Sequence, residues 1–171
     1  MIRFRIMAKV AILSLCIWQA ANAQSGKETN IPMQPQTEPP TRARINAKIT
    51  VQSSEAKPYD QAASPTLMEI NLTERFTGEI EGESQVRALQ VLRDDKSASL
   101  VSMQRFRGKL GGREGTFVLQ GSEMVENGKI KATWFVVPGS GTGDLSRLRG
   151  EGGFKGEFGK GSDGWLDYWF E

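Results

Sequence analysis

Residues 116–137 decide the fold and read TFVLQGSEMVENGKIKATWFVV. Two runs in this stretch, 116–124 and 129–137, are rich in β-branched and aromatic residues and alternate with a period of two, which is typical of strands. Between them lies Glu126-Asn127-Gly128-Lys129, and Asn-Gly readily adopts the positive φ that a tight hairpin turn requires. The stretch therefore predicts two antiparallel strands joined by a short turn.

The same pattern recurs on both sides of this hairpin. Eighteen of the 19 glycines lie from Gly78 onward, and no stretch holds a helical period. Glycine at this density suits tight turns and the bends by which a sheet closes and loses its exposed edges. We predict an all-β fold, a single closed or nearly closed eight-stranded antiparallel meander barrel, whose interior either is filled by side chains or holds one small ligand. The predicted strands cover residues 45–52, 68–76, 80–92, 97–107, 116–124, 129–137, 147–154 and 166–170.

The first 23 residues have the features of a secretory signal peptide. Three basic residues, the last of them Lys9, precede an apolar run over residues 10–18, and Ala21-Asn22-Ala23 provides a cleavage site. The apolar run is too short for a membrane-spanning helix, which needs about 20 residues. Cleavage after Ala23 would leave an exported chain, periplasmic or secreted, without an integral membrane segment.

The rest of the chain divides into a tether and a domain. Residues 24–41 hold four of the seven prolines among Gln, Thr, Ser and Glu, so we expect a disordered tether. Residues 42–171 have the usual size of one domain with a single core, and we assign them to the β-barrel.

Composition excludes several kinds of chemistry. The chain has no histidine, and its one cysteine, Cys16, lies in the signal segment. Disulfides, thiolate or imidazole metal ligands and histidine-activated nucleophiles are therefore excluded, and we expect no cofactor and no metal site. The signal segment holds three of the 22 Lys and Arg residues and none of the 20 Asp and Glu residues, so the remainder carries a net charge of −1. This near-neutral chain lacks the basic surface of a nucleic-acid-binding protein, and we expect no nucleic-acid partner.

Five motifs lie along the predicted barrel: FTGEIEGE at 76–83, RDD at 93–95, LGGREGTFVLQ at 110–120, WFVVPGSGTGDL at 134–145 and LRGEGGF at 148–154. Together they resemble the bacterial family known as domain of unknown function 3224. The resemblance implies a barrel like that of allene oxide cyclase, while function transfers less well than fold. Members of the family often carry a histidine directly after the Phe-Val-Leu-Gln stretch and another near the last strand. Here Gly121 and Gly164-Trp165 stand in those regions, so an imidazole base is not available.

Glu79, Glu81 and Glu83 alternate along one predicted strand, so an extended backbone points their carboxylates to one face. Such a face is either solvated and paired with arginines of a neighbouring strand, or a site for a cation or a coupled carboxylate pair. Glu81 and Glu83 are therefore the candidate catalytic residues in one hypothesis. That hypothesis is a cofactor-independent isomerase or cyclase resembling allene oxide cyclase.

Met103, Phe117 and Trp134 are the candidate ligand-binding residues. We place them around the barrel interior with Val101, where they form either a filled core or a small apolar pocket. The leading hypothesis is accordingly an exported barrel that binds a small apolar molecule without catalysis. Strand 129–137 also carries apolar residues on its opposite face, including Phe135, and this pattern favours a homo-oligomer.

Two further motifs each allow two interpretations. Asp94 and Asp95 either bind calcium weakly or cap their own turn, and the turn is favoured because no further acidic ligands follow at loop spacing. The glycine-rich stretch 137–143 lacks the lysine and helix of a phosphate-binding loop, so we interpret it as a flexible strand connection. An outer-membrane barrel is disfavoured, since the strand at 80–92 interrupts both faces with polar residues.

Overall fold

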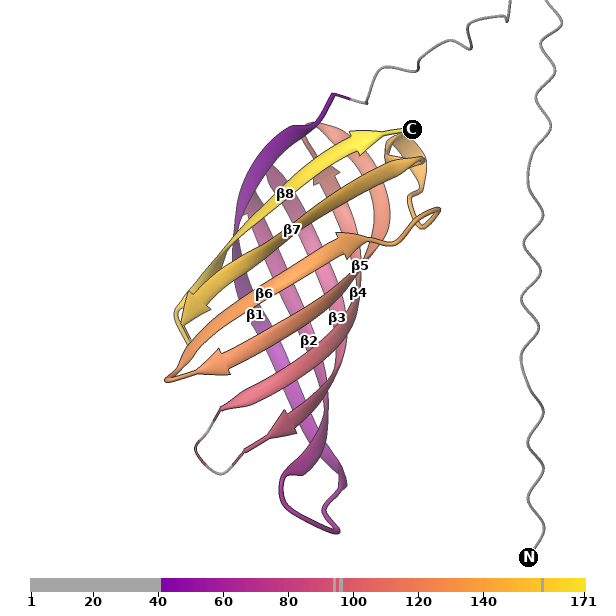
Figure 1. The fold of residues 1–171 in the computed structure, drawn as a ribbon. Helices are drawn as coiled ribbons and strands as arrows, with labels where there is room; N and C mark the ends of the chain where they lie inside the picture. The colour runs from indigo at the N-terminus through magenta and orange to yellow at the C-terminus, as the bar shows by residue number, and fades with distance from the viewer. Residues whose placement is uncertain (1–40, 94, 96, 158) are drawn as a thin grey trace, which may run out of the picture. The chain divides into compact units, whose positions relative to one another are not determined.

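The computed structural model describes residues 41–171 apart from residues 94, 96 and 158. The described residues form a closed barrel of eight antiparallel strands that follow one another in chain order (Figure 1). This confirms the predicted all-β meander barrel, whereas the segments predicted to be a signal peptide and a tether lie outside the described residues, apart from Thr41. Nowhere in the described part is there a helix long and apolar enough to cross a membrane. The strands are β1 Ala43–Asp60, β2 Thr66–Gly78, β3 Ile80–Leu92, β4 Ala98–Leu110, β5 Arg113–Glu126, β6 Lys129–Val136, β7 Leu148–Glu157 and β8 Gly161–Phe170.

The hairpin predicted from residues 116–137 is present as β5 and β6. Their pairing runs from Leu119 opposite Val136 to Glu126 opposite Lys129. Asn127 and Gly128 have φ values of 51° and 73°, so the turn uses the left-handed conformations that Asn-Gly favours. The turn chemistry thus fixes the register of the whole hairpin.

One rim of the barrel is oblique. β1 pairs with β8 only over Ala43 to Ile49 and continues to Asp60 beside β2 alone. Figure 1 shows the β1–β2 hairpin projecting furthest at this rim, while the β5–β6 and β7–β8 hairpins end well before it. Such stagger accompanies the tilt of strands in a closed barrel. It gives the barrel a closed half, where all eight strands pair around the interior, and an open half, which we define as residues 54–60, 66–72, 86–92, 98–104, 121–125 and 130–132.

Aromatic side chains fill the closed half. Phe106 packs edge-on against Phe76, with ring centroids 5.5 Å apart, and lies 4.8 Å from Phe117. Trp134 continues the cluster between Phe76 and Phe154, at 6.4 and 5.3 Å. The aromatic cluster therefore leaves this half of the barrel as a packed core rather than a cavity.

The loop between β6 and β7 packs against the closed half of the barrel. A 3-10 turn, Gly143–Leu145, buries Leu145 completely, and Thr142 N donates to the carbonyl of Thr116 at 2.9 Å. Ser140 Oγ in turn accepts from the amide of Val118 at 3.0 Å. The glycine-rich stretch does connect two strands, as expected, and backbone and hydroxyl hydrogen bonds hold it against β5.

β4 has the opposite facing from the one we predicted. Val101 and Met103 are 57% and 50% exposed on the outer face, whereas Ser102 and Gln104 are buried inside. The hydrophobic pattern misled the assignment because this strand carries polar residues on its inner face. Those inner polar residues belong to the candidate site.

Candidate functional site

The glutamates singled out from the sequence lie on the outer surface. Glu81 and Glu83 are exposed on β3, and Arg75 donates to Glu83 Oε1 at 3.2 Å. Glu79 lies in the bend before β3, where its Oε2 accepts from the amide of Asn46 at 2.9 Å. These contacts match the alternative of a solvated charged face, in which Glu83 pairs with Arg75 of the neighbouring strand β2.

The structure brings together two of the three predicted ligand-binding residues. Phe117 and Trp134 both belong to the buried core, with exposed fractions of 1% and 5%. Trp134 Nε1 donates to the carbonyl of Trp165 at 3.2 Å, which satisfies its polar atom inside the core. Met103 lies on the other side of the barrel wall, so the three side chains do not line one cavity. Ligand binding by these residues stays a prediction.

A polar cluster lies inside the barrel where the aromatic core ends. Glu74 of β2 and Glu123 of β5 are only 8% and 6% exposed, and both point inward. Ser102 Oγ of β4 donates to Glu123 Oε1 at 2.5 Å. Glu123 Oε2 is buried and has no hydrogen-bond partner among the described residues. We call Glu74, Ser102 and Glu123 the inner acidic site.

A second hydrogen bond continues this polar layer toward β3. Ser84 lies directly opposite Glu74, and its Oγ donates to Gln104 Oε1 at 2.9 Å. Both side chains are buried. The buried serine hydroxyls are thus already bonded, Ser84 to Gln104 and Ser102 to Glu123, which leaves Glu123 Oε2 as an acceptor still to be satisfied.

Burial raises the pKa of both carboxyl groups. The pKa of Glu74 rises to about 7, first because burial disfavours the charged form and second because the charge of Glu123 lies nearby. Burial also raises the pKa of Glu123, and the hydrogen bond from Ser102 opposes that rise. Near neutral pH Glu74 can therefore hold or release a proton, as a general acid or base must.

Gly121 makes room for the Ser102–Glu123 hydrogen bond. It lies opposite Ser102 on the inner face of β5, and a Cβ atom there would lie 2.7 Å from both Ser102 Oγ and Glu123 Oε1. This is the position at which the family resemblance led us to note a missing histidine. The one sequence signal that points to the inner acidic site is therefore the glycine beside it.

The open half gives the inner acidic site an apolar, partly accessible surrounding. Strand register places the following side chains on its inner face, where each is half-buried: Met68, Ile70, Leu72, Gln90, Leu100 and Ile130. In the closed half, by contrast, Phe76, Phe106 and Phe117 are buried almost completely. Solvent or a small molecule can thus reach the half-buried inward side chains of the open half from the oblique rim.

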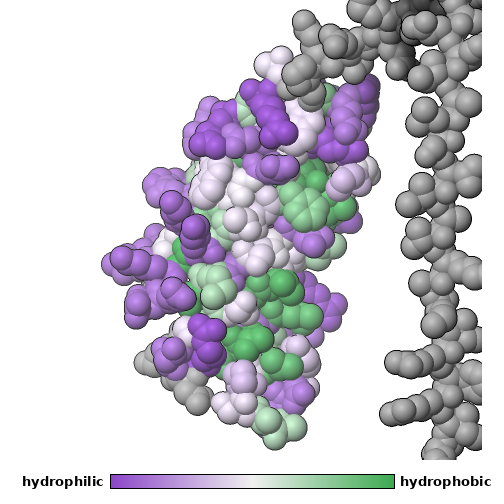
Figure 2. All heavy atoms as spheres, in the orientation of Figure 1, coloured by the Kyte–Doolittle hydropathy of each residue, from purple (hydrophilic) through white to green (hydrophobic). Residues whose placement is uncertain are grey.

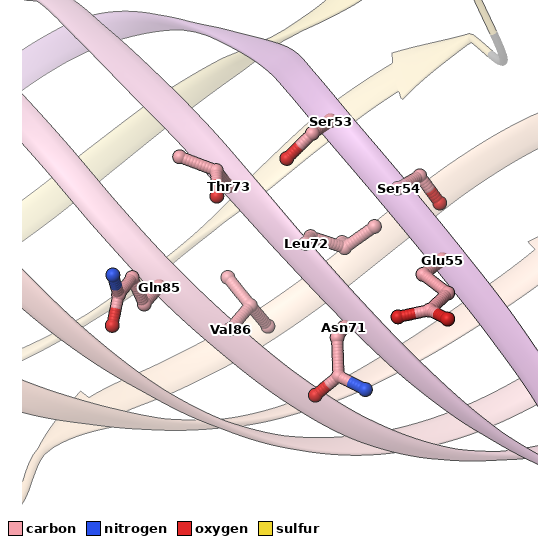
Figure 3. Close-up of a pocket in the computed structure, with 8 residues that line it drawn as sticks. All are labelled: Ser53, Ser54, Glu55, Asn71, Leu72, Thr73, Gln85 and Val86. Carbon is pink, nitrogen blue, oxygen red and sulfur yellow. The ribbon is translucent and has the colours of Figure 1, made fainter.

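A shallow groove also crosses the outer wall. It has a volume of about 430 Å³ and is lined by side chains from three adjacent strands, including Glu55, Asn71 and Gln85 (Figure 3). A neighbouring depression of about 440 Å³ shares Asn71 and Gln85 and extends to Met103 and Arg105. Exposed apolar residues, Met103 among them, alternate with charged ones on this outer wall, and Figure 2 shows such a mixed surface for one face of the barrel.

The structure bears separately on the two interpretations of the aspartate turn, metal binding and capping. Among the described residues, no group of three or more Asp or Glu side chains is disposed to hold a metal ion. Asp95 accepts from the amide of Ser97 at 2.9 Å, as expected for an aspartate that caps its own turn. Asp94 lies outside the described residues.

Sequence reasoning missed Glu74, Ser102 and Glu123 as site residues. Glu74 and Glu123 lie within runs of predicted strand residues, where a charged side chain is normally expected on the outer face. Their inward direction follows only from the register, with Glu74 opposite Ser84 and Glu123 opposite Leu100. The inner acidic site depends on which face of β4 points into the barrel. The sequence of one strand does not show which of its two faces that is.

The fold and the inner acidic site define a small antiparallel meander barrel with a carboxylate pair at the boundary between a filled and an open half. The chain belongs to the family described as "Protein of unknown function (DUF3224)", whose model matches residues 45–171. Among solved structures, it is similar to a protein of unknown function of this family from Shewanella oneidensis MR-1. The two share 29% identity with a TM-score of 0.61, over 77% of this chain and 99% of that one. No curated protein matches the chain.

Proposed function

We propose that this protein binds a small, largely apolar molecule in the open half of its barrel, anchored by the inner acidic site. The observation that carries the proposal is Glu123 Oε2, a buried acceptor without a partner. A buried polar atom left unbonded costs about 1–3 kcal/mol, so proteins retain such atoms chiefly where they serve a purpose. A ligand that donates a hydrogen bond would remove this cost.

The side chains around the inner acidic site favour a ligand that is largely apolar. Leu100 lies directly opposite Glu123 and is half-buried, and Ile70 and Leu72 line the same inner face. Small-molecule sites are commonly apolar surfaces with a few convergent polar groups, which matches this combination. The fully buried aromatic core does not leave equivalent space.

Adjacent residues of β4 provide a matched pair of variants to test this site. Leu100→Trp would fill the open half from inside, whereas Val101→Trp adds the same bulk on the outer wall, where Val101 is 57% exposed. We expect 1-hexanol to shift the backbone amide resonances of Leu100, Ser102 and Glu123 in a nitrogen-15 NMR titration. Leu100→Trp should weaken this binding at least tenfold and Val101→Trp should leave it unchanged. Equal behaviour of the two variants would contradict the proposal.

A second candidate function is proton transfer at a carbon atom, as in a cofactor-independent isomerase. The observation that favours it is the pKa of Glu74, which burial raises to about 7. A carboxyl group with a pKa near the working pH transfers protons most effectively. The catalytic carboxylate would then be Glu74 rather than Glu81 or Glu83.

Deuterium exchange tests this second candidate without knowledge of the substrate. Cyclohexanone in D₂O exchanges its α-protons slowly, and a base inside an apolar site should speed the exchange. We expect acceleration by the native protein and by Glu81→Gln, and none by Glu74→Gln. Equal exchange rates with Glu74→Gln and with the native protein would contradict this second candidate and leave ligand binding as the proposed function.

We further propose that the chain is exported, on the strength of the basic, apolar and Ala-Asn-Ala segments of its first 23 residues. Amino-terminal sequencing of protein isolated from its own host should find a chain that begins at Gln24. Recovery of the uncleaved chain, with its first 23 residues still attached, in the membrane fraction would contradict export.

A further inference from the structure

We infer that the molecule bound in the open half carries a cationic head of the primary or secondary ammonium class on its apolar body. The inference rests on the proposed function and adds the chemical class of the ligand. It follows from the charge, the hydrogen-bond capacity and the ligating groups of the inner acidic site.

The inner acidic site has negative groups and no positive one. Glu74 faces Val51 of β1 and Ser84 of β3, while Glu123 faces Leu100 of β4 and Ala132 of β6. The remaining described inward positions of the open half carry uncharged side chains. The ion pairs of the described residues join other side chains, none of them Glu74 or Glu123. A buried carboxylate without a positive partner is costly, so a ligand that supplies the charge gains binding energy.

The hydrogen-bond capacity of the site also calls for a donor. Ser102 already satisfies Glu123 Oε1, and the hydroxyl of Ser84 is used by Gln104. Glu123 Oε2 remains an acceptor, and an ionised carboxylate only accepts hydrogen bonds. An ammonium group offers up to three N–H donors together with a positive charge, and charge-assisted hydrogen bonds are about twice as strong as neutral ones.

The ligand set of the site favours an organic cation over a metal ion. Calcium takes six to eight oxygen ligands, more than the four oxygens of two carboxylates, and magnesium requires near-octahedral geometry. Glu74 and Glu123 are only two carboxylates, and the open half beside them is apolar. An alkylammonium uses both features, because its head contacts the carboxylates and its chain contacts Leu100 and Ile70.

Three probes of equal length separate the head group from the body. We would titrate n-hexylammonium, 1-hexanol and hexanoate into the native protein by calorimetry at pH 7.5. The expected order of affinity is hexylammonium above hexanol by at least tenfold, with hexanoate weakest because its charge repels Glu123. Calcium chloride serves as a fourth probe and should neither bind nor displace hexylammonium.

Variants of the two glutamates should remove the preference for hexylammonium over hexanol and leave the apolar part of the binding site intact. In Glu123→Gln and in Glu74→Gln we expect hexylammonium affinity to fall at least tenfold, to the level of hexanol, while hexanol binding persists. Glu81→Gln on the outer wall is the matched control and should retain the full preference. Thermal melts would check that each variant is folded. We expect folding to persist, because each substitution removes a buried charge and keeps the shape of the side chain.

The affinity for hexylammonium should also depend on pH. The ammonium and protons compete for the same carboxylates, and the pKa of Glu74 is about 7, so affinity should rise between pH 6 and pH 8. Hexanol carries no charge, and its affinity should change less than twofold over the same range. A flat profile for hexylammonium would contradict binding at the carboxylate pair.

The outcomes distinguish this inference from the proposed function. If hexanol binds as tightly as hexylammonium and Leu100→Trp removes both, the apolar site stands and the cationic head is wrong. If none of the three organic probes binds, the proposed function fails together with the inference. Displacement of hexylammonium by calcium would overturn the ammonium class in favour of a metal site.

Discussion

At the scale of single residues, Glu74 determines how stability depends on pH. Its pKa is about 7 in the folded protein against an ordinary value of 4.5. Between these values the folded protein keeps a proton that the unfolded chain releases, so stability falls as pH rises from about 4.5 to about 7. The buried Glu123, whose pKa is also raised, contributes with the same sign.

Glu74→Gln should remove most of this dependence. A shift of this size corresponds to roughly 2–3 kcal/mol of stability lost by the native protein between pH 5 and pH 8. The variant keeps the shape of the side chain but not its charge, so its unfolding free energy should fall much less over that range and keep only the contribution of Glu123. Guanidinium unfolding at both pH values measures the difference, with Glu81→Gln as control. Parallel pH profiles for Glu74→Gln and the native protein would show that Glu74 ionises normally.

At the scale of elements, alternation along β4 separates what the sequence could predict from what it could not. The hairpin of β5 and β6 follows from Asn127-Gly128 and from two alternating runs, because turn chemistry and period are local properties. The facing of β4 is not local, since Val101 and Met103 are as apolar as the inward residues of its neighbours. Only pairing with β3 and β5 puts Ser102 and Gln104 inside, and with them the inner acidic site.

A pair of substitutions tests the facing of the strands directly. Phe117→Ala on β5 should cost about 3–5 kcal/mol, because Phe117 is 1% exposed in the aromatic core. Met103→Ala on β4 should change stability by less than about 0.5 kcal/mol, since half of its surface is exposed. Denaturant titration of the two variants gives both values. A large loss for Met103→Ala would put that side chain back inside the barrel.

At the scale of the whole molecule, the barrel combines a filled half with an open one, and its stability should not depend on metal. The described residues hold no group of three or more acidic side chains that could share an ion, and the chain has no histidine. Chelator should therefore leave the melting temperature unchanged, because no metal-binding energy is linked to folding. A fall of several degrees after chelation would reveal a site built from oxygen ligands.

Two carboxyl groups lie inside the barrel, and burial raises the pKa of both, that of Glu74 to about 7. Carbon-13 NMR of the uniformly labelled protein follows the side-chain carboxyl group of every glutamate through a titration from pH 3 to pH 9. The resonance of Glu74, assigned by its loss in Glu74→Gln, should titrate near pH 7, and that of Glu123 should titrate above the ordinary range. Titration of every glutamate below pH 5 would contradict the inner acidic site and the functions proposed from it.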